Sequence, residues 1–156
     1  RLDGVDAVVH SVGAFTESPT DGETFERVNG DAAILTALEA ERAGVDTFVF
    51  LSAAAKPPGV RNAYLTAKRR AESSIADLDF DAVSLRPGPV YGEGQPHLPG
   101  VADRVLRFAA SAPPIASRLG ESRPLSVDTV ARATYRAAID PGERLLDVSD
   151  IRDLAR

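Results

Sequence analysis

The chain has 156 residues, of which 44% are hydrophobic and 26% charged, the balance of a water-soluble globular protein with a core of its own. Its 18 basic and 23 acidic residues give a net charge of -5, which argues against nucleic acid or an anionic membrane surface as the main partner. The absence of cysteine excludes disulfides, thiolate zinc sites and cysteine nucleophiles, and no apolar run reaches membrane-spanning length, so a cytoplasmic protein without membrane insertion is expected.

The first predicted elements are a strand and a long helix. A short apolar run bounded by glycines predicts a buried strand over Asp6–Ser11. After Pro19 the period changes, and apolar residues spaced three and four apart predict a helix over Asp21–Ala43, which ends at the C-cap Gly44. The residues that set this period are Phe25, Val28, Ala32, Leu35 and Leu38.

The middle of the chain repeats the pattern of strand and helix. A run rich in β-branched and aromatic residues predicts a second buried strand over Val45–Ser52. The prolines and glycine of Ala53–Arg61 predict a loop, and Asn62 is expected to cap a helix that runs to about Leu78. A third short strand is predicted over Asp81–Arg86.

The remaining elements complete an alternation of strands and helices. They are a loop over Gly88–Gly100, a helix over Val101–Ser111, an extended piece over Leu125–Val127, a helix capped by Asp128 that runs to Ile139, a strand over Leu145–Val148 and a helical turn opened by Ser149. Such alternation implies right-handed crossovers between parallel strands, with helices on both faces of the sheet. We therefore predict one α/β domain over residues 1–156, Rossmann-like and doubly wound.

A tyrosine and a lysine stand four residues apart near the start of the second predicted helix. Residues at this spacing lie on one helical face, so the phenol of Tyr64 and the ammonium of Lys68 are expected to project the same way. A nearby cation stabilises phenolate and lowers a tyrosine pKa towards the working range of a general acid or base. The alternative is a surface tyrosine over an exposed lysine, which the scarcity of both residue types disfavours.

A serine closes the second predicted strand, twelve residues before Tyr64. The carboxyl ends of parallel strands form the ligand crevice of such a sheet. The hydroxyl of Ser52 is thus expected to hydrogen-bond a substrate carbonyl that the tyrosine protonates. The alternative is a serine that satisfies the backbone at a strand end.

These residues, at these spacings, resemble the catalytic triad of the short-chain dehydrogenase/reductase superfamily, in its extended or atypical, NAD-dependent epimerase/dehydratase-like branch. The flanking sequence is similar to that branch in the same order along the chain. Two segments, Val8–Gly13 and Tyr64–Glu72, are also similar to relatives of the NAD(P)H-binding accessory subunit of respiratory complex I. The matching segments are Asp6–Gly13, Val28–Gly30, Leu85–Gly92 and Val127–Ala131, besides Ser52, Tyr64 and Lys68.

The resemblance implies an enzyme that moves hydride between NAD or NADP and a carbonyl or hydroxyl-bearing carbon of a small-molecule substrate. Tyr64 is implied to be the general acid or base, Lys68 to lower its pKa and hold the nicotinamide ribose, Ser52 to orient the oxygen, and Asn29 to hold the lysine through water. The residues implied to contact the cofactor are His10, Val12, Gly13, Tyr64, Lys68, Pro87, Gly88 and Val90, with packing in a strand as the alternative for His10. No metal is implied, and a homodimer through the helices over 21–43 and 62–78 is expected by analogy.

The glycine-rich turn that such a fold uses to bind pyrophosphate is not found in this sequence. The chain also begins at Arg1 without a methionine, so we expect a piece of a longer protein. The strand over Asp6–Ser11 would pair with the first strand of that protein, and without this neighbour it presents an unpaired apolar edge. Three hypotheses follow: an NAD(P)-dependent oxidoreductase or epimerase, a non-catalytic NAD(P)-binding accessory, assembly or redox-sensing protein, and an inactive truncated fragment.

Overall fold

The computed structural model describes residues 2, 4–57, 59–92, 106, 109 and 120–156. Four of its strands form one parallel sheet, in the order β1 (Ala7–His10), β2 (Thr47–Leu51), β3 (Asp81–Leu85) and β6 (Leu145–Leu146). The predicted α/β class with a parallel sheet is confirmed. The carboxyl ends of β1, β2 and β3 therefore meet at the same edge of the sheet.

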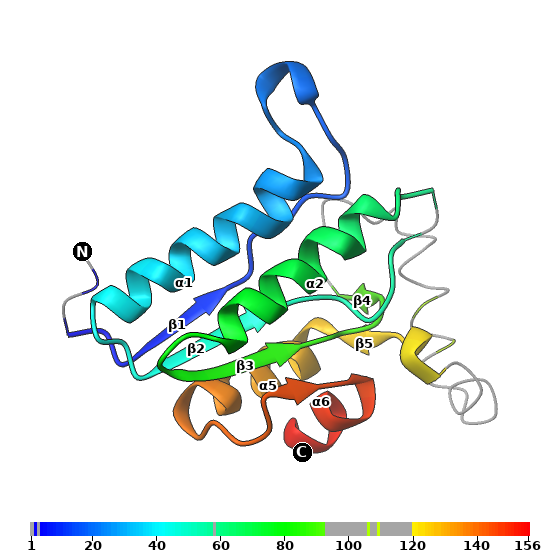
Figure 1. Cartoon of the computed structure of the whole chain (residues 1–156). Coiled ribbons are helices and arrows are strands. Elements are labelled where there is room, and N and C mark those ends of the chain that lie inside the picture. Colours follow the sequence, from blue (N-terminus) through cyan, green and yellow to red (C-terminus); the bar gives the residue numbers. More distant parts are fainter. Residues whose placement is uncertain (1, 3, 58, 93–105, 107–108, 110–119) are drawn as a thin grey trace.

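Helices cover both faces of this sheet (Figure 1). The helices α1 (Ala32–Arg42) and α2 (Ala63–Ala76) lie on one face, and α5 (Val127–Ile139) and α6 (Val148–Leu154) lie on the other. Alternate side chains of β2 point to opposite faces, so Phe48 and Phe50 pack with α1 and α2, while Val49 packs with α5 and α6. This explains why the residues of Phe48–Leu51 are all apolar, as is typical of a strand buried on both faces.

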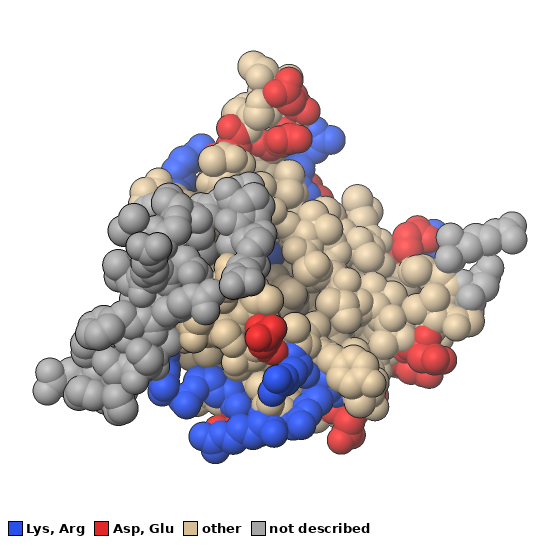
Figure 2. Space-filling view, turned by 180° about the vertical axis from the view of Figure 1, so that it is seen from behind, with Lys and Arg blue, Asp and Glu red and all other residues tan. Residues whose placement is uncertain are grey.

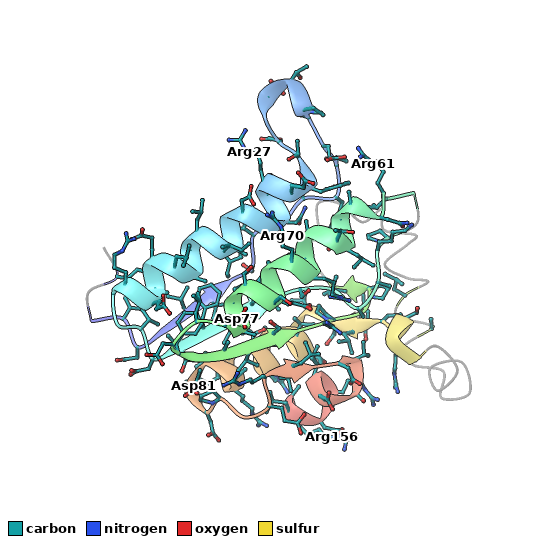
Figure 3. The ribbon with its side chains drawn as sticks, in the orientation of Figure 1. Arg27, Arg61, Arg70, Asp77, Asp81 and Arg156 are labelled. Carbon is teal, nitrogen blue, oxygen red and sulfur yellow. The ribbon has the colours of Figure 1, made fainter. Side chains whose placement is uncertain are left out.

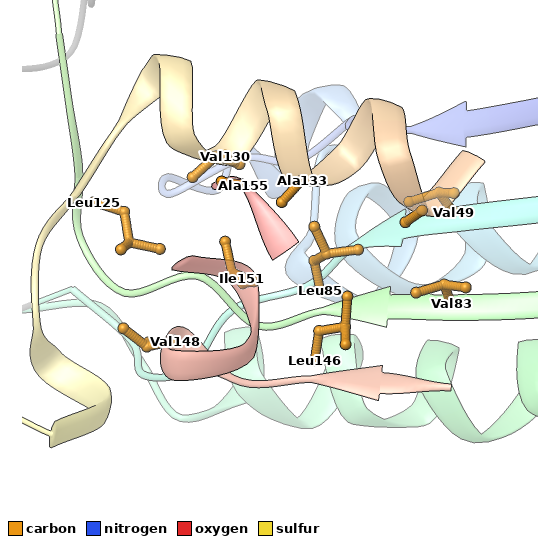
Figure 4. Packing of buried hydrophobic residues seen from close by; sticks show 11 residues of the cluster. Val49, Val83, Leu85, Leu125, Val130, Ala133, Leu146, Val148, Ile151 and Ala155 are labelled. Atoms are coloured by element: carbon orange, nitrogen blue, oxygen red, sulfur yellow. The ribbon is translucent and has the colours of Figure 1, made fainter. Parts of the chain in front are cut away.

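The core on the side of α5 and α6 lies beside the strand ends (Figure 4). It contains Leu85 and Ile151, which are completely buried, together with alanines of α5. Burying a large aliphatic side chain contributes about 1.5–3 kcal/mol. Close packing against α5 and α6 thus holds in place the strand ends that would form a ligand crevice.

Two short strands and two helical turns complete the described chain. The strand β4 (Val90–Tyr91) pairs in parallel with β5 (Leu125–Ser126) in a separate two-stranded sheet. Single turns of 3-10 helix occur as η1 (Pro19–Asp21) and η3 (Gly120–Ser122). Among the described helices, none has the length and apolar character needed to cross a bilayer.

The predicted helix over Asp21–Ala43 is wrong at its start. Residues 18–23 form a turn closed by an isolated bridge between Ser18 and Glu23, and Gly22 adopts a left-handed conformation with φ 77°. The chain then enters a six-residue π-helix, η2 (Glu26–Asp31), before α1 begins. A π-helical turn is uncommon and occurs most often at functional sites.

The apolar side chains that set the predicted helical period do not all face the core. Leu35 is 63% exposed and Leu38 is 39% exposed, whereas α1 buries Ala33, Ala37 and Ala40. A π-helical turn contains an extra residue, so it changes which positions face inward after it. The buried alanines then allow α1 to approach the sheet closely.

Several other predicted boundaries are corrected by the structure. Asn62 lies in helical conformation and makes no side-chain cap, so it does not cap α2 as predicted. Ser126 caps α5 by accepting from the Thr129 amide, in place of Asp128, which lies in the first turn. Asp147 caps α6, which shortens the last strand to Leu145–Leu146. The predicted helix over 101–111, and most of the loop before it, lie outside the described residues.

Two arginines join α2 to the segment that precedes α1 (Figure 3). Arg61 Nη1 lies 2.7 Å from Glu17 Oε2, and Arg70 Nη2 lies 2.5 Å from Asp31 Oδ1 at the end of η2. Both arginines are exposed, so each pair contributes little to stability. They nevertheless show which side of α2 faces η2 and the segment before it.

The strand β1 lies at the edge of the four-stranded sheet, as expected from the sequence. Val9 is 45% exposed, and Val12 in the following loop is 53% exposed. The view from behind (Figure 2) shows basic side chains gathered along the lower margin of the described surface, further charged side chains at its top and right, and a largely uncharged area between them.

An unpaired apolar edge strand favours pairing with another chain. We therefore predict that the isolated chain folds poorly or associates through β1. Size-exclusion chromatography should show oligomers whose fraction falls when Val9 is replaced by lysine. A monodisperse monomer that melts cooperatively would contradict this prediction.

Candidate active site

The candidate active site lies where the ends of β1 and β2 meet the first two turns of α2. The side chain of Lys68 is 3% exposed and connects the two strands at this point. Its ammonium donates to the Leu51 carbonyl at 2.9 Å and lies 3.5 Å from the Val12 carbonyl. It also lies 4.8 Å from the centre of the Phe50 ring, a cation–π contact. Burial lowers the pKa of Lys68 to about 8, although the charge of Glu72 opposes the shift.

Asn29 and Gly13 meet beside this lysine. Asn29 is completely buried in η2, and its side-chain amide both accepts from the Ala14 amide and donates to the Ala14 carbonyl, each at 3.0 Å. A Cβ atom placed on Gly13 would lie 2.8 Å from Asn29 Oδ1 and 3.4 Å from Lys68 Nζ. The structure therefore brings three of the predicted site residues together, and only glycine fits between the other two.

Tyr64 is buried one helical turn before Lys68. It is 4% exposed and packs with Phe25 and Ala53, and its ring centre lies 5.7 Å from that of Phe15. Burial raises the pKa of Tyr64 to about 12, and the cation that opposes the shift is Arg69. The expectation that a neighbouring lysine lowers this pKa is therefore not met, because burial of the phenol outweighs the nearby charge.

Ser52 is engaged by charged groups on α2. Its hydroxyl accepts from Arg69 Nη1 at 3.2 Å, and the same Nη1 atom donates to Glu72 Oε1 at 2.7 Å. The next residue, Ala53, is the one that packs with Tyr64. The structure therefore brings Ser52 to the end of β2 as predicted, with its hydroxyl bonded to the charged cluster.

His10 lies inside the packed layer beneath the site. It is 5% exposed, and its ring centre lies 6.4 Å from Phe48 and 5.9 Å from Phe50. Burial, and after it the charge of Lys68, lower the pKa of His10, so the ring is held neutral. Its Nε2 atom is buried without a hydrogen-bond partner among the described residues.

The other predicted cofactor contacts lie along the same edge of the sheet. Val12 and Gly13 are exposed after β1, and Pro87, Gly88 and Val90 are half-buried after β3. The loops that follow β2 and β3 are joined, because the Ala54 amide donates to the Pro87 carbonyl at 2.9 Å.

The shifted pKa values of Lys68 and Tyr64 predict how stability depends on pH. The lysine pKa is about 8 in the folded chain against 10.5 ordinarily, so the unfolded chain binds more protons between these values and stability rises with pH. The tyrosine pKa is about 12 against 10.0 ordinarily, so above pH 10 the folded chain binds more protons and stability falls. Each arm should amount to about 1–3 kcal/mol.

Urea denaturation followed by circular dichroism, from about pH 7 to about pH 11, tests this dependence. Lys68→Met should remove the rising arm, and Tyr64→Phe should remove the falling arm. A parent chain whose stability is flat between pH 8 and pH 10 would contradict the lowered pKa of the buried lysine.

Sequence reasoning missed Glu72 as a residue of this site. It is 8% exposed and pairs with Arg69 and with Arg86, which follows β3. Its spacing was an available signal, because a carboxylate four residues after Lys68 must share the helical face of the phenol and the ammonium.

The sequence matches the model of a protein family described as "NAD dependent epimerase/dehydratase family" over residues 1–141. Ceramide reductase from Caulobacter vibrioides is 28% identical over 151 residues, which cover 96% of this chain and 45% of that protein. The chain spans less than half the length of the curated relatives it matches.

Solved structures share the fold at lower identity. MoeE5 in complex with UDP-glucuronic acid and NAD has a TM-score of 0.64 at 20% identity, covering 94% of this chain and 57% of the other. UDP-glucuronic acid 4-epimerase from Bacillus cereus in complex with NAD has a TM-score of 0.60 at 15% identity, covering 90% and 51%.

Proposed function

The chain belongs to the NAD dependent epimerase/dehydratase family, and from that premise we propose that it is the catalytic part of an NAD(P)-dependent oxidoreductase or epimerase/dehydratase-like enzyme. Residues 1–156 would then be the C-terminal two-thirds of a reductase domain. The observation that carries the proposal is that one face of α2 presents Tyr64 and Lys68 where β1 and β2 end.

The residues present fit the nicotinamide side of NAD. Lys68 has three N–H donors, of which the Leu51 and Val12 carbonyls account for two among the described residues, so one can reach a ribose hydroxyl. The missing side chain of Gly13 keeps the surface beside this ammonium open. Together with Val12, Pro87, Gly88 and Val90, these residues would hold the nicotinamide half. When bound, the cofactor supplies or accepts the hydride.

In the direction of reduction, Tyr64 donates its phenolic proton to the carbonyl oxygen as the hydride reaches the carbonyl carbon, and the phenolate then regains a proton from solvent. A phenol with a pKa of about 12 is fully protonated at neutral pH, which suits this donation. In the reverse direction the same group must be ionised, which the charge of Arg69 favours. Ser52 accepts from Arg69, so its own O–H can donate to the substrate oxygen and orient it.

Reduction of a carbonyl is favoured over epimerisation of a sugar. The relative that covers 96% of this chain is a ceramide reductase, whereas the matched sugar-nucleotide enzymes are 20% identical or less. We therefore expect a lipid-like carbonyl compound as the substrate class. Asn29 supports the site by fixing the loop after β1, and the exposed leucines of α1 are suited to a homodimer.

The test is hydride transfer by the purified protein. NADH and NADPH consumption should be followed by absorbance with a ceramide-type lipid ketone, and epimerisation of UDP-glucuronic acid should be followed by chromatography. Oxidation of the reduced cofactor that depends on the ketone supports the proposal. The proposal fails if neither cofactor binds and neither reaction occurs.

A second candidate is a protein that binds NAD(P) without turnover. The observation in its favour is that burial raises the pKa of Tyr64 while the Ser52 hydroxyl is already bonded to Arg69. Such a protein would bind NADH but consume none, with Tyr64 serving only to pack the loop after β1.

A further inference from the structure

Three groups with different chemistry share one face of α2. Tyr64, Lys68 and Glu72 follow one another at intervals of four residues, and all three are buried. Desolvation of a carboxylate costs several kcal/mol unless charged partners and hydrogen bonds compensate for it. Glu72 lies one helical turn beyond Lys68, and its buried charge therefore requires compensating partners.

On one side, Glu72 is bonded to the end of β3. Arg86 donates from Nε to Glu72 Oε1 at 3.0 Å and from Nη2 to Glu72 Oε2 at 2.5 Å, a two-pronged contact. The Arg86 amide in turn donates to the Leu146 carbonyl of β6 at 2.8 Å. The two hydrogen bonds between Arg86 and Glu72 thus hold α2 against the sheet in one orientation.

On the other side, Glu72 is bonded to the end of β2 through Arg69. The Nη1 atom of Arg69 lies 2.7 Å from Glu72 Oε1 and 3.2 Å from Ser52 Oγ. Its Nη2 atom donates to the Ala53 carbonyl at 2.8 Å and lies 3.4 Å from the Ala54 carbonyl. One guanidinium therefore holds the three residues that follow β2, directly after the Leu51 carbonyl that binds the lysine.

We propose that Glu72, with Arg69 and Arg86, is a positioning residue that sets the place and the charge of the Lys68 ammonium, an inference that rests on the proposed function. The cluster holds α2 and the end of β2 in one register, and the contact between Lys68 and the Leu51 carbonyl spans these two elements. General stability does not explain this arrangement, because buried ion pairs often contribute little net stability.

The charges that act on Lys68 agree with this role. Burial lowers its pKa, and the negative charge of Glu72 is what opposes the loss of the proton. His10 on β1 is held neutral, so it adds no second positive charge next to the ammonium. Arg69, from the same cluster, acts on Tyr64 in the direction that favours phenolate.

The experiment measures the titration of Lys68 itself. The chain contains two lysines, Lys56 and Lys68, so NMR of the protein labelled with carbon-13 lysine gives two side-chain signals, which Lys56→Arg assigns. Glu72→Gln should move the Lys68 titration to lower pH and reduce its ratio of charged to neutral form at pH 8 by about threefold or more. Arg69→Gln should move the titration to higher pH.

Glu39→Gln is the matched control. Glu39 also pairs with an arginine three residues away, Arg42, at 2.7 Å, but that pair is exposed on α1. This variant should leave the Lys68 titration unchanged. An unchanged titration in folded Glu72→Gln, or shifts of the same sign in both cluster variants, would overturn the proposal. If Glu72→Gln does not fold by circular dichroism, the result for Arg69→Gln decides alone.

Binding of NADH separates this inference from the proposed function. Lys68→Met should weaken NADH binding strongly, and Glu72→Gln should weaken it by about threefold to tenfold. If Lys68→Met binds as the parent does, or the parent does not bind, the proposed function fails whatever the titration shows. If Lys68→Met weakens binding while Glu72→Gln changes neither binding nor titration, only the positioning role fails.

Discussion

Tyr64→Phe is expected to lower turnover by about 100-fold or more while NADH affinity stays within about twofold of the parent value. The substitution removes the phenolic oxygen, which is the only atom of Tyr64 that the mechanism uses. It keeps the ring, which packs with Phe25 and Ala53. Burial raises the pKa of the phenol to about 12, so the group is uncharged at neutral pH. Its loss therefore removes no charge from the interior, and the fold should be retained. Steady-state NADH consumption and an equilibrium binding titration measure the two effects separately.

Tyr135→Phe is the matched control for this prediction. Tyr135 is 65% exposed on α5, so loss of its hydroxyl should change neither turnover nor binding. Retained turnover in Tyr64→Phe would remove the phenol from the mechanism. NADH binding without turnover in the parent protein would instead favour the second candidate, a binding protein.

The fold could be predicted from the sequence wherever a residue pattern is compatible with a single physical explanation. The apolar run Phe48–Leu51 of β2 is expected to be buried on both faces, and the structure buries it between two helical layers. The start of α1 was not predicted, because the turn at Gly22 and the π-helical turn of η2 do not alter the apolar spacing from which the helix was predicted. The same turn shifts the helical phase, so the leucines that suggested a buried face are exposed.

The part of the candidate site that depends on residue spacing along one helix could be predicted from the sequence. Tyr64 and Lys68 share a face because they are four residues apart, and the structure buries both. The direction of the Ser52 hydroxyl was not readable, because it depends on Arg69 and Glu72 and on the way α2 is rotated against the strand ends. The sign of the tyrosine pKa shift was missed because burial, which outweighs charge here, is a property of the folded chain.

Gly13→Ala is expected to lower stability by about 1–3 kcal/mol and to weaken NADH binding by about tenfold or more. The new Cβ would lie 2.8 Å from Asn29 Oδ1, closer than such atoms can approach. Asn29 cannot move away without losing both of its hydrogen bonds to Ala14, because it is completely buried. The loop after β1 must therefore move, and the Val12 carbonyl, one contact of Lys68, moves with it.

Gly142→Ala provides the control for that substitution. A Cβ placed on Gly142 would meet nothing within 4 Å, so the variant measures the general effect of replacing a glycine in this chain by alanine. Chemical denaturation should show a loss only in Gly13→Ala, and its Lys68 NMR signal should shift as well. Equal stability of the two variants would mean that the loop after β1 is free to adjust, and that Asn29 does not fix the position of the ammonium.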